Sequence, residues 1–174
     1  MRRYGRFMGE RSVRSPTDDG WSPGGDQPLL VSACLLGVAC NHRGRASPSE
    51  EVKALSRDRR LIPICPESVG GLPTPREEAA LGPDGRVRTA SGEDVTSSYE
   101  AGAHHTVALA AATGAAGAVL KARSPSCGCH EIYDGTFTHT RVEGQGVTAK
   151  ALQEAGVRVW SEEDVAKGEG PEPT

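Results

Sequence analysis

The sequence predicts a single three-layer α/β domain, in which a mostly parallel, Rossmann-like sheet is covered by helices on both faces. Its 174 residues are about the length of one domain. Short apolar runs typical of buried strands alternate along the chain with segments that carry helix-start signals. Such alternation indicates βαβ units, and because their crossovers are right-handed, helices are expected on both faces of the sheet.

Four short apolar runs are the expected strands of this sheet. They cover residues 29–33, 61–64, 117–121 and 157–160. The second run contains Pro63, which has no backbone N–H to donate and is therefore expected in a strand at the edge of the sheet. A turn signal at Asp84-Gly85, inside an otherwise loop-rich region, predicts a β-hairpin.

Two helix starts are marked by a serine followed three residues later by a glutamate, the pattern of a capping box. One begins at Ser47 and the other at Ser97. The second of these helices is rich in alanine, ends at Gly114 and carries two adjacent histidines that are expected to face solvent or to pack. Two further helices are expected to begin at Thr148 and Ser161.

The two ends of the chain lack the periodicity of folded segments. Residues 1–27 are polar and rich in glycine, proline, serine and arginine, which predicts a disordered N-terminal arm. Residues 168–174 have a similar composition and are expected to form a flexible tail. The folded domain is therefore expected to span residues 28–167.

Composition narrows the class of protein. A net charge of −3 and a pI near 6.0 argue against a dedicated nucleic-acid binder, which usually carries a basic surface. No apolar run approaches the roughly 18 residues of a membrane helix, and no secretory signal is seen, so a cytoplasmic location is expected. In that compartment five cysteines, an odd number, indicate metal binding or catalysis rather than disulfides.

Three of the expected strands lead into loops that carry a cysteine. Cys34 and Cys65 directly follow the first and second strands, and Cys127 lies in the loop after the third. In a parallel sheet these loops all leave from the carboxyl ends of the strands, which is the edge where open α/β sheets bind ligands. Three thiols that are far apart in the sequence are therefore expected to converge in space.

The number of these cysteines bears on what they bind. A structural or electron-transfer iron–sulfur cluster normally has four cysteine ligands. Three thiolates can hold three irons of a [4Fe–4S] cluster and leave the fourth iron open, as catalytic zinc sites keep one position open. Because an open iron can act as a Lewis acid, the three cysteines indicate non-redox chemistry on a small molecule.

The two remaining cysteines, Cys40 and Cys129, leave other interpretations open. Zinc is the alternative metal, held by Cys127, Cys129 and His130 with another thiol in a non-catalytic protein. Cys40 is either a bystander or the fourth ligand of a structural or redox-sensing cluster. Any buried cysteine can also serve simply as a small apolar side chain.

Polar residues near the three cysteines are candidates for catalysis and substrate binding. Glu67 follows Cys65 by two residues, and a desolvated carboxyl group there would suit a general acid or base, the alternative being a surface salt bridge. Ser124 and Ser126 can hydrogen-bond a ligand or simply form the turn. Arg76 and Lys121 are candidate substrate-binding cations, although an exposed arginine would fit equally well.

The order of these motifs resembles a known family, the TudS-type thiouracil desulfidases, long catalogued as a domain of unknown function. The resemblance covers about residues 29–165 and rests on six segments: 32–37, 65–76, 92–96, 120–121, 124–128 and 132–137. It implies a [4Fe–4S] enzyme that removes sulfur from a thiolated pyrimidine such as 2-thiouracil, giving uracil and sulfide by non-redox hydrolysis. It further implies Cys34, Cys65 and Cys127 as cluster ligands, with Glu67 and Ser124 nearest to the chemistry.

One loop departs from the family pattern. Members often carry Arg-Tyr-Asp-Gly after the first cysteine loop, whereas this chain has Asn41-His42-Arg43-Gly44. The aromatic and acidic side chains are missing from a loop that is expected near the substrate. The metal site is therefore expected to follow the family more closely than the substrate site does.

Overall fold

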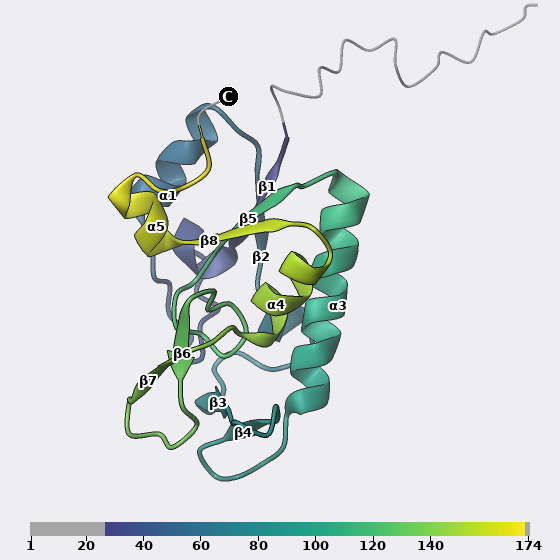
Figure 1. Ribbon diagram of the computed structural model, residues 1–174, viewed down its shortest axis with the longest axis vertical. Helices are drawn as coiled ribbons and strands as arrows, with labels where there is room; N and C mark the ends of the chain where they lie inside the picture. The colour runs from purple at the N-terminus through teal and green to yellow at the C-terminus, as the bar shows by residue number, and fades with distance from the viewer. Residues whose placement is uncertain (1–26, 173–174) are drawn as a thin grey trace, which may run out of the picture.

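A computed structural model describes residues 27–172, and at its centre is a four-stranded parallel sheet (Figure 1). The strands are β1 (Leu29–Ser32), β2 (Leu61–Ile64), β5 (Gly117–Leu120) and β8 (Arg158–Ser161). They lie in the order β2-β1-β5-β8, with each neighbouring pair parallel. The predicted parallel sheet is confirmed, and so is the edge position of the strand that contains Pro63.

Helices flank the sheet on two sides. The α-helices are α1 (Glu50–Ala54), α2 (Pro66–Val69), α3 (Thr96–Thr113), α4 (Val147–Glu154) and α5 (Glu162–Lys167). Two 3₁₀ helices, η1 (Ala33–Leu36) and η2 (Leu55–Arg57), follow β1 and α1. α3 packs against α4, and α1 packs against α5 on the opposite side of the sheet (Figure 1).

Alternation along the strands builds an apolar core on each face. In β1, Leu30 joins Leu152 of α4 in one cluster, whereas Val31 joins Val52 of α1 in the other. All four of these side chains are fully buried. The predicted three-layer arrangement is therefore confirmed, and the carboxyl ends of the strands are held by packing on both sides.

Both predicted capping boxes at the first two helices are wrong in detail. α1 begins at Glu50 because Ser49, not Ser47, accepts the capping hydrogen bond from the Val52 N–H. The Ser47 N–H instead donates to the Cys34 carbonyl, which holds the chain extended alongside η1. α3 begins one residue earlier than predicted and has no side-chain cap, but it ends at Gly114 as expected.

Two hairpins lie beyond the carboxyl edge of the sheet (Figure 1). The first pairs β3 (Ala79–Leu81) with β4 (Val87–Thr89) and confirms the turn predicted at Asp84-Gly85. The second pairs β6 (Glu131–Tyr133) with β7 (Arg141–Glu143), in a region predicted to be a loop. The β7 residues are all exposed, so no apolar alternation marked this strand in the sequence.

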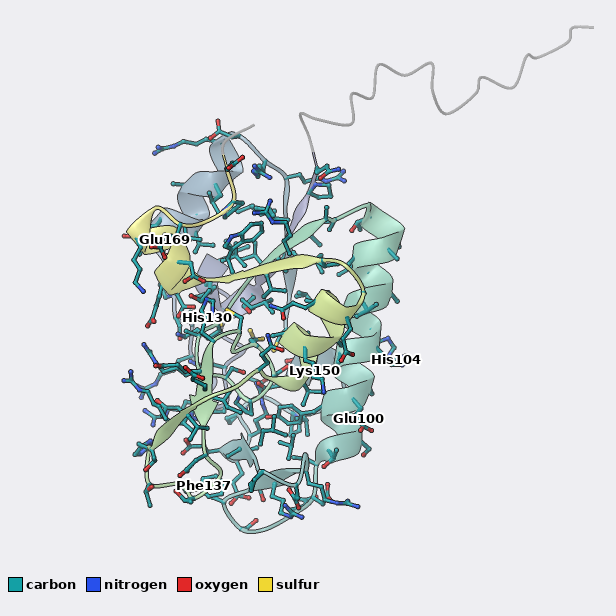
Figure 2. The ribbon with its side chains drawn as sticks, in the orientation of Figure 1. Glu100, His104, His130, Phe137, Lys150 and Glu169 are labelled. Atoms are coloured by element: carbon teal, nitrogen blue, oxygen red, sulfur yellow. The ribbon has the colours of Figure 1, made fainter. Side chains whose placement is uncertain are left out.

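The predicted N-terminal arm lies outside the described residues except for Gln27. At the other end, the Glu172 carbonyl accepts a hydrogen bond from Arg59, and the flexibility of the tail stays a prediction. His104 and His105 are exposed on α3, with His104 pointing away from the sheet (Figure 2). Within residues 27–172, no helix combines the length and apolar character that a membrane crossing requires.

Candidate active site

A cavity of about 260 Å³ lies beyond the carboxyl ends of β1, β2 and β5. Cys34, Cys65 and Cys127 all line it, so the three thiols that the sequence predicted to converge do so. Cys40 lines the same cavity, close to Cys65, whose thiol lies 3.7 Å from the Cys40 carbonyl oxygen. The cavity therefore holds four of the five cysteines of the chain.

Each of the three predicted ligands is placed by a short turn at the end of its strand. Cys34 lies in η1, which Gly37 ends with a left-handed φ of 100° that suits glycine. Cys65 is the residue before α2, with Pro66 at the first helical position. Cys127 lies in a turn whose N–H groups at Ser126 and Cys127 both donate to the Ser124 hydroxyl, each at 3.1 Å.

Ser32, the last residue of β1, joins two of these loops. Its hydroxyl donates to the Cys127 sulfur at 3.5 Å and accepts from the Lys121 N–H at 2.9 Å. Ser32 is 3% exposed, so these contacts are made away from water. In the sequence, the signal that marks Ser32 is a serine that closes an otherwise apolar strand.

Burial raises the pKa values of three cavity thiols, those of Cys34, Cys40 and Cys127. Burial, together with the neighbouring Cys65, raises the pKa of Cys34 to about 11. Burial also raises the pKa of Cys127 to about 12, despite the Ser32 hydrogen bond, and that of Cys40 to about 12. Because thiolates are the metal ligands, a cationic metal or cluster is the partner that would ionise these groups.

Glu67 is the carboxylate of this cavity, and Arg76 holds it. The Arg76 Nε–H donates to Glu67 Oε2 at 2.7 Å, and both side chains are largely buried, at 7% and 13% exposure. The other guanidinium nitrogens donate to the Cys40 and Pro73 carbonyls and to the Thr74 hydroxyl. Four hydrogen bonds to protein acceptors thus hold the Arg76 side chain in place.

The second oxygen of Glu67 is not bound by Arg76, and Glu67 lines the cavity. The Ser124 hydroxyl donates to Glu67 Oε1 at 3.4 Å, which brings the two predicted catalytic residues together. Tyr99 of α3 also lines the cavity, and burial and the nearby Glu67 raise the pKa of its phenol. Sequence reasoning missed Tyr99, because a buried tyrosine in a helix is indistinguishable from a core residue.

The remaining predicted substrate-binding residues fall in different places. Lys121 lines the cavity, where its ammonium group is paired with Glu162. Ser126 is fully buried, and its hydroxyl is 2.9 Å from that of Thr148 in the core instead of lining the cavity. The structure therefore brings Lys121, Arg76 and Ser124 to the cavity wall and leaves Ser126 behind it.

The loop that departs from the family pattern forms part of the cavity wall. Asn41 and His42 line the cavity. The Asn41 side chain accepts from the N–H groups of Arg43 and Arg45, at 3.0 and 2.8 Å, which closes the loop on itself. Since the Arg76 N–H donates to the His42 carbonyl at 2.8 Å, the altered loop also supports the residue that holds Glu67.

The zinc set considered from the sequence is divided between two cavities. Cys127 lines the first, whereas Cys129 and His130 line a second one beside α5. The donor that joins Cys129 and His130 there is the carboxylate of Asp164, not another thiol. The predicted zinc set is therefore wrong, because Cys127 lies on another wall; Cys129, His130 and Asp164 form a different potential metal group.

A parallel α/β fold with thiols and a paired carboxylate at its carboxyl edge defines a protein built to hold a metal or cluster next to a small ligand. Residues 29–164 match the family described as 2-thiouracil desulfurase. The chain belongs to this family, as the sequence motifs predicted.

Two relatives cover most of the chain. A solved structure, the [4Fe-4S]-dependent thiouracil desulfidase TudS (DUF523Vcz), matches with a TM-score of 0.75 and 38% identity over 81% of this chain and 94% of that chain. The uncharacterized protein YbbK of Bacillus subtilis (strain 168) is 42% identical over 146 residues, covering 79% of this chain and 97% of the relative. The likeness therefore spans the domain and not only the cysteine loops.

Proposed function

We propose that this chain is a [4Fe–4S]-dependent desulfidase that removes sulfur from a thiolated pyrimidine such as 2-thiouracil and acts in the cytoplasm. The observation that carries the proposal is a single cavity that brings together three strand-end thiols and the Glu67–Arg76 pair. The reaction replaces sulfur by the oxygen of water, giving uracil and hydrosulfide without any net transfer of electrons. Membership in the 2-thiouracil desulfurase family supports this substrate class.

Cys34, Cys65 and Cys127 would hold the cluster. The donor set fits the group, because buried thiols with raised pKa values release their protons to solvent readily only when a strongly cationic partner binds their sulfur atoms. Ser32 donates to the Cys127 sulfur, the kind of hydrogen bond that tunes a cluster. When bound, the cluster would supply an iron without a protein ligand, a Lewis acid for the thiocarbonyl sulfur.

Glu67 is the general base of the proposed reaction. It accepts the proton of the water that attacks the carbon bearing sulfur, through the carboxylate oxygen that is not bound by Arg76. Arg76 positions this carboxylate and compensates its charge in the buried wall. Ser124 lies between the Cys127 turn and Glu67, where its hydroxyl can orient the water or the substrate.

The substrate is a small molecule held by the rest of the cavity wall. Lys121 lines this wall with its charge compensated by Glu162, so it suits a polar oxygen or nitrogen better than a free anion. Arg76 contributes through Glu67, because most of its donors already bind protein acceptors. Asn41 and His42 would set the preference among thiolated pyrimidines, since they replace family residues on the same wall.

Anaerobic purification followed by a sulfide-release assay tests the proposal. The protein is expected to contain iron and acid-labile sulfide and to convert 2-thiouracil to uracil. Glu67→Gln should keep the iron and lower kcat by about 10²–10⁴-fold, the usual contribution of a general base. The exposed Glu100 on α3 provides the matched control, Glu100→Gln, which should leave turnover unchanged.

Two outcomes would contradict this function. A protein that stays colourless after anaerobic cluster reconstitution does not hold the cluster. A cluster that disappears in Cys40→Ser would make Cys40 a fourth ligand and favour a structural or redox-sensing role, because Cys40 lies in the same cavity. Retention of both cluster and turnover in Cys40→Ser is the result expected here.

A further inference from the structure

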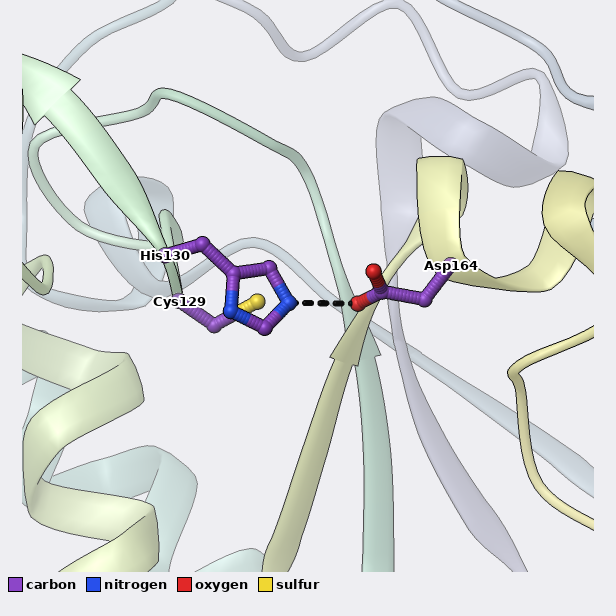
Figure 3. Close-up of side chains that lie close together, drawn as sticks. All are labelled: Cys129, His130 and Asp164. Carbon is purple, nitrogen blue, oxygen red and sulfur yellow. Dashed lines mark hydrogen bonds and ion pairs between the residues drawn. The ribbon is translucent and has the colours of Figure 1, made fainter.

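A second cavity of about 260 Å³ lies on the other side of the Cys127 loop, between the β6–β7 hairpin and α5. Cys127 lines the first cavity, and Cys129, two residues further on, lines the second. Cys129, His130 and Asp164 have no role in the proposed desulfidase reaction. These three side chains nevertheless gather at one point (Figure 3).

The three side chains lie close enough together to become ligands of one ion after small side-chain movements. One donor atom from each residue lies within 4.8 Å of the other two. A tetrahedral zinc ion with the usual bond lengths separates its nitrogen, oxygen and sulfur ligands by about 3.3–3.6 Å. The His130 Nε2–H donates to Asp164 Oδ2 at 2.7 Å, so a small movement of the ring opens the space for an ion.

Burial gives the group a closed side and an open side. Cys129 and Asp164 are 5% and 7% exposed, whereas the His130 side chain is 63% exposed. His130 lies at the surface, between the β6 region and α5 (Figure 2). An ion can therefore enter past the imidazole, and a water molecule can complete the coordination from solvent.

The carboxylate is held in place before any ion arrives. Asp164 is the third residue of α5, and its Oδ2 accepts from the Ser161 N–H at 2.7 Å in a capping box. The neighbouring charged side chains partly compensate one another, because Arg123 pairs with Glu163 and lies 3.7 Å from Glu131. Ligands oriented by such outer hydrogen bonds bind metals more tightly than free side chains do.

We propose that Cys129, His130 and Asp164 form a second metal site, separate from the cluster cavity, that binds one Zn²⁺ ion with water as the fourth ligand. A thiolate, an imidazole and a carboxylate together favour zinc over magnesium or calcium, which prefer oxygen ligands alone. Binding releases the thiol proton to solvent, and the imidazole proton moves to Nδ1, which leaves the Nε2 lone pair for the ion.

Such an ion would join two segments that lie far apart in the sequence. Cys129 and His130 precede β6, and Asp164 belongs to α5 after the last strand of the sheet. Since Cys129 shares its turn with Cys127, the ion would also brace the loop that carries a proposed cluster ligand. The site is thus a structural clamp behind the cluster cavity.

Cobalt binding to the full-length, cluster-loaded protein tests this site. Co²⁺ is paramagnetic, whereas the oxidised cluster gives no electron paramagnetic resonance signal, so the ion can be observed beside it. We expect one tightly bound Co²⁺ per chain, displaced by one equivalent of Zn²⁺. Cys129→Ala and His130→Ala should each weaken binding by more than about 100-fold, which exceeds the effect of losing an outer partner.

The control removes two exposed histidines that lie far from the proposed site. His104→Ala combined with His105→Ala should bind Co²⁺ as the wild type does, because these imidazoles lie on α3, away from Cys129. Added Zn²⁺ should also raise the unfolding temperature of the wild type and of this control, but not that of the Cys129 or His130 variants.

Three results would overturn the site. These are wild-type protein without tight Co²⁺ binding, unchanged affinity in both Cys129→Ala and His130→Ala, and loss of binding in the His104/His105 control alone. Each would leave His130 and Asp164 as a simple hydrogen-bonded pair. None of them bears on iron content or sulfide release, so failure of this site is distinguishable from failure of the proposed desulfidase.

Discussion

At the scale of single residues, the chemistry of the cavity depends on partners that the chain supplies from distant positions. Glu67 comes from α2, Arg76 from the loop that follows it, and Ser124 from the loop after β5. The sequence identified all three as candidates because of their types and their nearness to cysteines. It could not show that Arg76 donates a hydrogen bond to Glu67, because that pairing depends on how the loop after α2 folds back onto the helix.

Replacing Arg76 tests whether its planar group matters or only its charge. Arg76→Lys keeps the charge but loses the fork that reaches Glu67 and the Cys40 carbonyl at once. We expect kcat to fall about 10–100-fold, less than in Glu67→Gln, with KM for 2-thiouracil nearly unchanged. Steady-state kinetics provides the measurement, and a change confined to KM would instead make Arg76 a substrate ligand.

The buried thiols predict how the cluster-free protein responds to alkali. Burial and the neighbouring Cys65 raise the pKa of Cys34 to about 11, so the folded state holds its proton above the pH at which the unfolded chain releases it. The resulting stabilisation is complete below pH about 9 and is lost as the pH rises to about 11.

Urea unfolding of the cluster-free wild type and of Cys34→Ala across this pH range measures the effect. The wild type should lose on the order of 2–3 kcal/mol more than the variant, since each unit of pKa corresponds to about 1.4 kcal/mol. Parallel pH profiles for the two proteins would show that Cys34 is ionised or solvated in the folded state.

At the scale of elements, the strands were predictable and the small helices were not. Four apolar runs gave the four strands of the sheet nearly to the residue. In the central strands β1 and β5, burial on both faces leaves a continuous apolar run without polar alternation. α2 has only four residues, too few for a helical period. The start of α1 was misplaced because backbone hydrogen bonds from Ser47 and Ser49 to η1, which are tertiary contacts, decide it.

The packing of α3 against α2 places Glu67, and glycines at the contact permit it. A Cβ atom at Gly102 would lie 2.1 Å from the Pro66 carbonyl oxygen, far inside any real contact. Gly102→Ala should therefore destabilise the fold by about 1–3 kcal/mol, the usual cost of overpacking, and lower turnover by displacing α2.

The sign of this change makes the experiment decisive. On an exposed helix, alanine is favoured over glycine by about 1 kcal/mol, so stabilisation by Gly102→Ala would contradict the close approach. Ala111→Gly, on the exposed side of α3, serves as the control and should cost about 1 kcal/mol with normal turnover. Urea unfolding and the sulfide-release assay give both readouts.

At the scale of the whole molecule, the proposed cluster ligands follow three adjacent strands, β2, β1 and β5. The convergence of the thiols could be predicted because parallel strands end at one edge. The second cavity could not, since Asp164 reaches Cys129 only once α5 has packed beside β8 and the β6–β7 hairpin has formed. Contacts within one sheet are thus easier to anticipate than contacts between separate elements.

Removal of the cluster should loosen one edge of the molecule and leave the rest intact. The loops that carry Cys34, Cys65 and Cys127 are expected to lose hydrogen-exchange protection by about tenfold or more, because a bound group stabilises only the states that hold it. The β3–β4 hairpin, which contributes no cysteine, should exchange at the same rate. Uniform loss across the sheet would instead indicate that the cluster is required for the fold itself.

The position of Cys127 in the chain has a consequence for how the protein is made. During synthesis, Cys34 and Cys65 emerge with β1 and β2, but β1 also needs β5 as its other neighbour, and β5 follows the long helix α3. An unfinished chain thus presents two of the three proposed ligands and part of the cavity wall. With the proposed ligands, delivery of the cluster must wait until the sheet has closed around β1, so folding precedes loading and only a completed domain can accept iron.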